Sequence, residues 1–193
     1  MVTGLIGMSL HAADNATDPG ELVWFGLDYS LVRFIGLQSQ FTDLDKIQQE
    51  YFRSWNELVL LEKDKYNVKN AFGARRIDYQ MELAIERSQE ADIYNLVQVE
   101  EYKISEEEAA RVVGAYTDPG VDKLGAIFVM ETMDKMEARS TMWVIVFNIS
   151  SGEVHYMKRH MGRVGGFGFR NYWARSYYEV LKNLNISINR YNP

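Results

Sequence analysis

Residues 124–158 read LGAIFVMETMDKMEARSTMWVIVFNISSGEVHYMK, and they carry the clearest β-strand pattern of the chain. Two runs rich in β-branched and aromatic residues, 124–131 and 141–150, flank a polar loop. A tight turn at 150–153 then leads into a third run at 154–158. Runs of this composition, bounded by turn residues, are typical of β-strands. We therefore predict a meander of three strands in this part of the chain.

The residues upstream supply further β segments. Residues 21–36, ELVWFGLDYSLVRFIG, form an apolar run without strict alternation, which indicates one long strand or two short ones buried on both faces. Residues 75–86, RRIDYQMELAIE, alternate imperfectly between apolar and polar side chains. We predict a strand at 75–86, although its Met, Glu, Leu and Ala residues also suit a helix.

Helical signals separate these runs. Asp43 offers a cap for an amphipathic helix of about five turns that reaches Glu62. The residues Ser-Glu-Glu-Glu at 105–108 form a capping box, and the short helix behind it stops at 117–120. A terminal helix begins near Asn171.

The order of these elements predicts the fold class, a single α/β domain over 21–193. It has a mixed β-sheet with a strand meander and helices packed on the sheet, and an α+β arrangement is the alternative. The length of 193 residues suits one domain that buries roughly 70% of its unfolded surface. With 47% hydrophobic residues and three prolines, the composition excludes a disordered or collagenous chain. Cysteine is absent, and no apolar run reaches the ~18 residues of a transmembrane helix.

The first residues indicate the cellular localisation of the protein. Residues 1–20 are predicted to be a signal-peptide remnant or a disordered leader, because an apolar stretch ends in Leu-His-Ala-Ala at 10–13 and a polar segment follows. No Lys or Arg precedes the apolar stretch, as a start codon assigned too late would explain. We expect a periplasmic or secreted protein, with a cytoplasmic one as the alternative.

Charge is divided unevenly along the chain. The net charge is −6, but residues 1–154 carry 14 basic and 26 acidic groups, whereas 155–193 carry seven basic groups and a single acidic one, Glu179. Aromatic residues are interleaved with these C-terminal cations, as in proteins that bind single-stranded nucleic acid. The acidic remainder of the chain would repel a polyanion. We therefore do not expect nucleic acid as a partner, and expect most of these cations to pair with the protein's own acidic surface.

The Gly-rich stretch at 162–171, GRVGGFGFRN, is the first candidate site. Its glycines allow backbone amides to converge on an anion, and its two arginines are able to clamp a phosphate or carboxylate. It fits neither nucleotide-binding fingerprint. The alternative is a flexible connection whose two phenylalanines tuck into the core while the glycines relieve crowding. The candidate contact residues for a ligand or partner are Arg163, Gly165, Gly166, Gly168 and Arg170.

Asp28 is the second candidate because it interrupts an apolar run. If buried, it needs a partner such as Arg33 or Arg170. At strand period two it shares a face with Trp24 and Gly26, so it either lines a cleft or lies at an edge. The three histidines have no metal-ligand spacing and no nucleophile motif is present, so we expect no metal, no cofactor and no local catalytic triad.

Two blocks of sequence carry a resemblance to a known family. Residues 23–36 and 165–174 resemble a family of uncharacterised secreted proteins from Bacteroidota, and the resemblance spans 21–185. It implies an exported soluble or envelope α/β protein and brings no catalytic residues. A weaker similarity is to the small periplasmic α/β domains of curli-secretion and penicillin-binding-protein-activator type, where a strand ends in Asp-x-x-Thr-Gly-Glu-Val. Residues 148–154 have Asn for that Asp and Ser for that Thr, so this similarity is a hint at fold alone.

The leading hypothesis is a non-catalytic secreted or envelope protein that binds a partner protein or a small anionic ligand through the Gly-rich stretch and Asp28. The alternative is a hydrolase-type enzyme that acts on an envelope polymer or a small anionic substrate, with Asp28 as its acid or base. The sequence does not indicate an oligomeric state.

Overall fold

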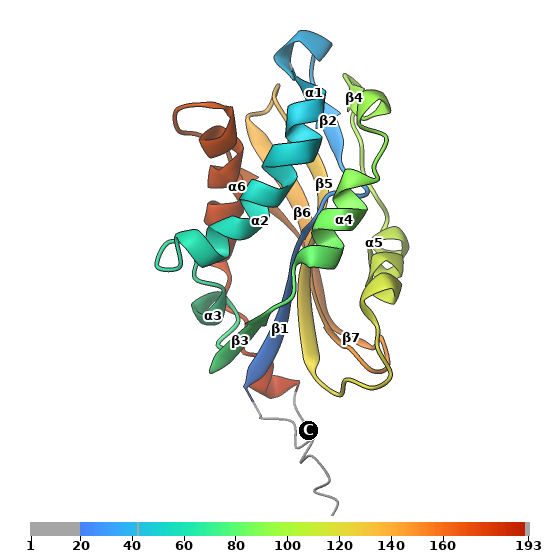
Figure 1. The fold of residues 1–193 in the computed structure, drawn as a ribbon, viewed down its shortest axis with the longest axis vertical. Helices are drawn as coiled ribbons and strands as arrows, with labels where there is room; N and C mark the ends of the chain where they lie inside the picture. Colours follow the sequence, from blue (N-terminus) through green and yellow to red (C-terminus); the bar gives the residue numbers. More distant parts are fainter. Residues whose placement is uncertain (1–19, 42, 192–193) are drawn as a thin grey trace, which may run out of the picture.

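Seven strands form one mixed sheet through the middle of the molecule, in a computed structural model that describes residues 20–41 and 43–191 (Figure 1). The strands within these residues are β1 (Glu21–Asp28), β2 (Arg33–Ile35), β3 (Arg76–Tyr79), β4 (Val97–Gln98), β5 (Leu124–Asp134), β6 (Arg139–Asn148) and β7 (Val154–Arg163).

The long strand β5 organises the sheet. Along one edge it pairs with β6, which pairs in turn with β7, and both pairings are antiparallel. Along its other edge the first part of β5 pairs with β1 and Thr132–Asp134 pair with β2, both in parallel. Strands β3 and β4 lie parallel to β1 and β2 at the far side of the sheet. The predicted α/β domain, with its mixed sheet and strand meander, is confirmed.

Helices cover both faces of this sheet (Figure 1). The helices are α1 (Leu44–Lys46), α2 (Phe52–Leu61), α3 (Val68–Ala71), α4 (Glu82–Gln89), α5 (Glu106–Val113) and α6 (Phe169–Asn183). A π-helical turn at Ile47–Tyr51 joins α1 to α2, so this helical segment is continuous. Helices α2, α3 and α6 pack on one face, α5 packs on the other, and α4 lies beside β1.

Alternating side chains of the central strands build two hydrophobic cores. Phe128 and Val144 point into the larger core, under α2 and α6, with Trp24 at its centre. Their neighbours Ile127 and Ile145 point into the smaller core, under α5. Strands buried on both faces explain why the sequence of this sheet lacks strict alternation.

The helix caps and the two strands within 21–36 are as predicted. The run at 21–36 is two short strands, β1 and β2. The side chain of Asp43 accepts from the backbone N–H of Lys46 at 3.1 Å. The Ser105 hydroxyl accepts from the Glu108 N–H at 3.1 Å, and the Glu108 carboxylate accepts from the Ser105 N–H at 2.8 Å, which completes the capping box.

The strand predicted at 75–86 is wrong in its second half, because β3 ends at Tyr79 and α4 begins at Glu82. Ala84, Ile85 and Ser88 are buried on one side of this helix, a spacing that a strand does not give. The Ser88 hydroxyl donates to the Ala84 carbonyl one turn earlier, at 2.6 Å. Strong helix formers therefore prevail over the imperfect alternation.

The Gly-rich loop is shorter than the predicted 162–171. Strand β7 continues to Arg163 and α6 begins at Phe169, which leaves 164–168 irregular. Gly162 belongs to strand β7, and this position requires a glycine because α6 crosses β7 closely there. A Cβ at this position would lie only 1.9 Å from the Ser176 carbonyl oxygen.

The predicted leader, residues 1–20, lies outside the described residues except for Gly20. Within the part of the chain that the structure describes, none of the helices is long and apolar enough to cross a membrane.

Candidate functional site

Asp28 is completely buried and holds three hydrogen bonds. Its Oδ2 accepts from Arg87 Nε and from the Tyr116 hydroxyl, each at 2.8 Å, and its Oδ1 accepts from the Ser30 N–H at 2.7 Å. An arginine partner was expected, but it is Arg87, from α4, and not Arg33 or Arg170. Asp28 therefore ties β1 to α4 and to the turn that follows α5.

Asp28 faces the smaller core, because the pairing register of β1 and β5 shifts between Trp24 and Gly26. The predicted face shared with Trp24 is wrong, since Trp24 lies in the larger core and Asp28 contacts Tyr116 in the smaller one. Burial raises the pKa of Tyr116, and the negative charge of Asp28 raises it further, so this hydroxyl remains a proton donor. The surroundings of Asp28 are those of an internal anchor.

The Gly-rich loop, residues 164–168, exposes the ring of Phe167, whereas Phe169, the first residue of α6, is half-buried. Gly166 and Gly168 have φ values of 106° and 81°, a region that favours glycine, and Phe167 between them is 96% exposed. Phe169 packs on Trp55 and Trp173, with ring centroids 6.5 and 6.2 Å away. The interpretation that both phenylalanines tuck into the core is right for Phe169 and wrong for Phe167.

The two candidate arginines lie on either side of this loop. Arg163 is exposed at the end of β7, and Arg170 donates to the side chain of Asn171 at 3.2 Å. A hollow of about 360 Å³ opens beside the loop, and neither arginine lines it. Its lining residues are Glu62, Lys65, Tyr66, Gly165, Gly166, Phe167, Asn171, Arg175 and Tyr178. Asp28 lies in the core on the opposite face of the sheet, so the loop and Asp28 do not form one pocket.

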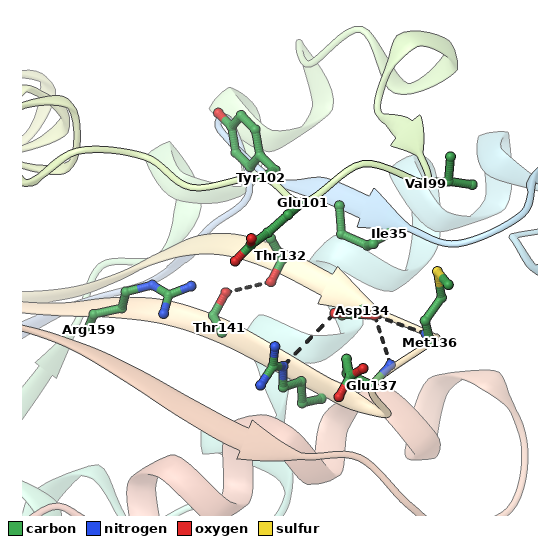
Figure 2. A pocket seen from close by; sticks show the side chains of 11 residues that line it. Ile35, Val99, Glu101, Tyr102, Thr132, Asp134, Met136, Glu137, Thr141 and Arg159 are labelled. Atoms are coloured by element: carbon green, nitrogen blue, oxygen red, sulfur yellow. Dashed lines mark hydrogen bonds and ion pairs between the residues drawn. The ribbon is translucent and has the colours of Figure 1, made fainter.

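A larger cavity of about 410 Å³ lies at the same end of the sheet, on its other face (Figure 2). Residues 99–104, here called the strap, follow β4 and lie over β5, where they form the roof of the cavity. The lining residues are Ile35, Val99, Glu101, Tyr102, Thr132, Asp134, Met136, Glu137, Arg139, Thr141 and Arg159.

A buried carboxylate, Glu131, fixes both the strap and one wall of this cavity. One of its oxygens accepts from the backbone N–H of Ile104 in the strap at 2.9 Å, and the other accepts from Arg159 Nε at 2.5 Å. On the cavity floor the hydroxyls of Thr132 and Thr141 are hydrogen-bonded to each other at 2.5 Å. The cavity is therefore preformed by hydrogen bonds across four segments of the chain.

Glu101 is the strap acid that lines the cavity, and it is exposed. Its carboxylate pairs with Lys103 at 2.8 Å, and this ammonium group lowers the pKa of Glu101 most. The positive charges of Arg139 and Arg159 lower the same pKa further. Both cavity arginines thus act on this carboxylate through their charge, without a hydrogen bond to it.

Sequence reasoning missed this cavity. The residues that could have indicated it are Glu131, an acid at the end of the apolar run 124–131, and Arg159 in the hairpin that follows. Without the sheet register, nothing brings these two side chains together, because they are 28 positions apart.

The Gly-rich loop and the turn between β5 and β6 lie at one end of the molecule, here called the hairpin end (Figure 1). Met136 and Glu137 of this turn line the cavity, so the cavity is at the same end, on the other face of the sheet. The Val164 N–H donates to the Ala138 carbonyl in this turn at 3.1 Å. The Lys135 ammonium lies 3.8 Å from the ring centroid of Tyr172 in α6. Exposed apolar side chains of this end are Leu37, Val99, Met136 and Phe167.

Two of the seven C-terminal cations form ion pairs among the described residues, so the expectation that most of them pair with the protein's own acidic groups is not confirmed. Arg159 binds Glu131, and Arg175 binds Glu179 at 3.0 Å. The two C-terminal histidines have separate neighbours, since His155 stacks on Tyr191 and His160 is 3.1 Å from the Tyr156 hydroxyl. Burial lowers the pKa of His160, and the charge of Lys158 lowers it further.

No protein-family model matches this chain, and no curated protein matches it. Among solved structures it is similar to the LpoB C-terminal domain from Salmonella enterica, with 9% sequence identity over 78% of this chain and 87% of that one, at a TM-score of 0.34. The resemblance to small periplasmic α/β domains of the penicillin-binding-protein-activator type is shown only as this distant similarity of fold. At so low a TM-score it carries no argument about function.

Proposed function

We propose that this chain is a non-catalytic protein of the cell envelope that binds a protein partner through its hairpin end, with Phe167 as the central contact. The observation that carries this proposal is the 96% exposure of Phe167. An aromatic ring exposed to water is unfavourable. Aromatic side chains of this kind are enriched among residues that dominate binding energy at interfaces.

The neighbouring residues fit a protein surface better than a small anion. Gly166 and Gly168 give the loop its backbone shape and leave the ring of Phe167 free to enter a pocket of a partner. Met136 and Leu37 are exposed at the same end, and Arg163 adds a cation at its edge. An apolar centre with a polar rim is the usual anatomy of a protein interface.

The buried position of Asp28 favours binding over catalysis. An acid or base catalyst must come within hydrogen-bond reach of a substrate, directly or through one water molecule. Asp28 is wholly enclosed, and its two oxygens already accept from Arg87, Tyr116 and Ser30. We therefore assign Asp28 a structural role in this proposal.

Site-specific photo-crosslinking in the native cell tests the proposal. A photoreactive phenylalanine analogue replaces Phe167 in one variant and Leu61, which is 71% exposed at the end of α2, in a matched control. The expected result is a discrete crosslinked species from position 167 that is absent from position 61. Crosslinking that is equal at the two positions, or absent from both, would contradict the proposal.

The localisation to the cell envelope is a separate part of the proposal, and a separate measurement tests it. It is supported by the small-residue site at 10–13. The intact mass of the protein purified from its native cell is expected to correspond to a chain beginning near residue 14. A native protein that retains residues 1–13 and fractionates with the cytosol would refute this localisation.

A further inference from the structure

The cavity beneath the strap has two unlike walls. Ile35, Val99 and Met136 form an apolar side, while Thr132, Thr141 and Arg159 lie together on the opposite, polar side (Figure 2). Its volume of about 410 Å³ is within the range of sites for small ligands, roughly 300–1,000 Å³. A ligand that fills this space combines an apolar body with a polar group at one end.

The polar wall offers hydrogen-bond donors. Arg159 uses its Nε on Glu131, and within the described residues its two terminal NH₂ groups have no hydrogen-bond partner. Arg139 donates one terminal NH₂ to the Met161 sulfur at 3.6 Å. Because the two threonine hydroxyls share one hydrogen bond, one hydroxyl hydrogen remains free to donate. A carboxylate matches such a set, since its two oxygens accept from a guanidinium fork.

The acidic side chains around the two cavity arginines would make this site selective among anions. Glu131 binds Arg159, and Asp134 lies 4.0 Å from Arg139, so each cavity arginine has an internal acid nearby. Glu101 adds an exposed carboxylate within the field of both arginines, and Glu137 adds another exposed carboxylate to the lining. A bound anion therefore gains directed hydrogen bonds more than net charge, and the apolar wall has to contribute to its affinity.

We propose that this cavity binds a small carboxylate that carries a branched apolar group. The carboxylate accepts from Arg159, Arg139 and the threonine pair, and the apolar group packs on Ile35, Val99 and Met136. The same chemistry occurs in a free branched acid and at the carboxyl terminus of a peptide that ends in leucine. The site does not depend on the partner contact at Phe167, which lies on the other side of the hairpin end.

Titration of the full chain with N-acetyl-L-leucine tests this inference, with backbone amide NMR shifts as the readout. Shifts are expected at the strap and at the ends of β5 and β6. N-acetyl-L-leucinamide is the matched control probe, and it is expected to bind at least about tenfold more weakly because it lacks the charge-assisted hydrogen bonds. The peptide N-acetyl-Gly-Gly-Leu distinguishes the two sources. Tighter binding than that of N-acetyl-L-leucine assigns the site to a chain end, and equal binding assigns it to the free acid.

Two variants are expected to change the affinity for N-acetyl-L-leucine in opposite directions, and a third serves as a control. Arg159→Gln is expected to weaken binding of N-acetyl-L-leucine about tenfold, whereas Arg111→Gln, exposed on α5 and away from the cavity lining, is expected to leave binding unchanged. Glu101→Gln changes only an exposed side chain and removes a like charge, so it is expected to tighten binding of the acid about threefold and to leave the amide unaffected. Equal binding of acid and amide, weaker binding of the acid by Glu101→Gln, or no shift at the strap at millimolar acid would each overturn the inference.

Discussion

Replacing Phe167 by alanine is expected to leave the stability of the fold unchanged, whereas the same replacement at Phe169 is expected to lower it. The two rings are separated by Gly168 and have the same chemistry, so each variant is the control for the other. Phe167 is 96% exposed, and Phe169 is half-buried against the rings of Tyr51, Trp55 and Trp173.

The size of each effect follows from this difference in burial. Truncating a fully buried phenylalanine costs about 3–5 kcal/mol. Phe169 keeps part of its surface in water when folded, so we expect Phe169→Ala to lower the free energy of unfolding by about 2 kcal/mol. An exposed substitution changes it by less than about 0.5 kcal/mol, which is the value expected for Phe167→Ala.

Urea unfolding followed by tryptophan fluorescence measures both variants, because Trp55 and Trp173 contact the ring of Phe169. With a urea dependence of about 2 kcal/mol/M, the midpoint of Phe169→Ala shifts down by about 1 M and that of Phe167→Ala by less than about 0.3 M. If Phe167→Ala loses as much stability as Phe169→Ala, Phe167 is packed against the protein. Phe167 is then a structural residue and not a partner contact.

Three further predictions concern the fold that supports the hairpin end. Gly162→Ala places a methyl group against the Ser176 carbonyl, so urea unfolding is expected to show a loss of about 3 kcal/mol, and an unchanged midpoint would contradict the close crossing of α6 and β7. Asp28→Asn removes the charge that faces Arg87 and is expected to cost about 3 kcal/mol in the same assay, and a stability equal to wild type would exclude the anchoring role. Burial alone raises the pKa of Glu21, but hydrogen bonds from Arg76 and Lys123 outweigh it and hold this pKa below its ordinary value. The ionised Glu21 therefore stabilises the fold at pH values above its ordinary pKa, and this stabilisation is lost as the pH falls through the pKa that Glu21 has in the folded protein. The stability difference between wild type and Glu21→Gln is expected to shrink between about pH 5 and pH 3. A difference that grows over this range would contradict the prediction.

The sheet was the most predictable part of the fold. The runs at 124–131 and 141–150 are long, rich in β-branched residues and bounded by turns, so composition alone identifies them as strands. The stretch 75–86 was less predictable, because alternation and helix propensity compete there. Its outcome depends on β1, which pairs in parallel with only four residues of this stretch, Arg76–Tyr79.

The binding features were predictable only in part. The glycines of 164–168 mark a loop with unusual backbone geometry, and the sequence indicates that much. The sequence does not show which of Phe167 and Phe169 is exposed. That depends on the position at which α6 begins, because its first residue, Phe169, packs on Trp55. Asp28 and Arg87 are 59 positions apart, so the arginine that neutralises Asp28 follows only from the packing of α4 on β1.

We propose that Phe167 contacts a protein partner, and the affinity of that partner for three purified chains measures this contact. Once crosslinking at position 167 has identified the partner, its Kd is measured for the wild-type chain, for Phe167→Ala and for Leu61→Ala. A central interface contact contributes at least about 2 kcal/mol, so Phe167→Ala is predicted to weaken binding about 30-fold while Leu61→Ala leaves it unchanged. An equal Kd for wild type and Phe167→Ala would contradict the account.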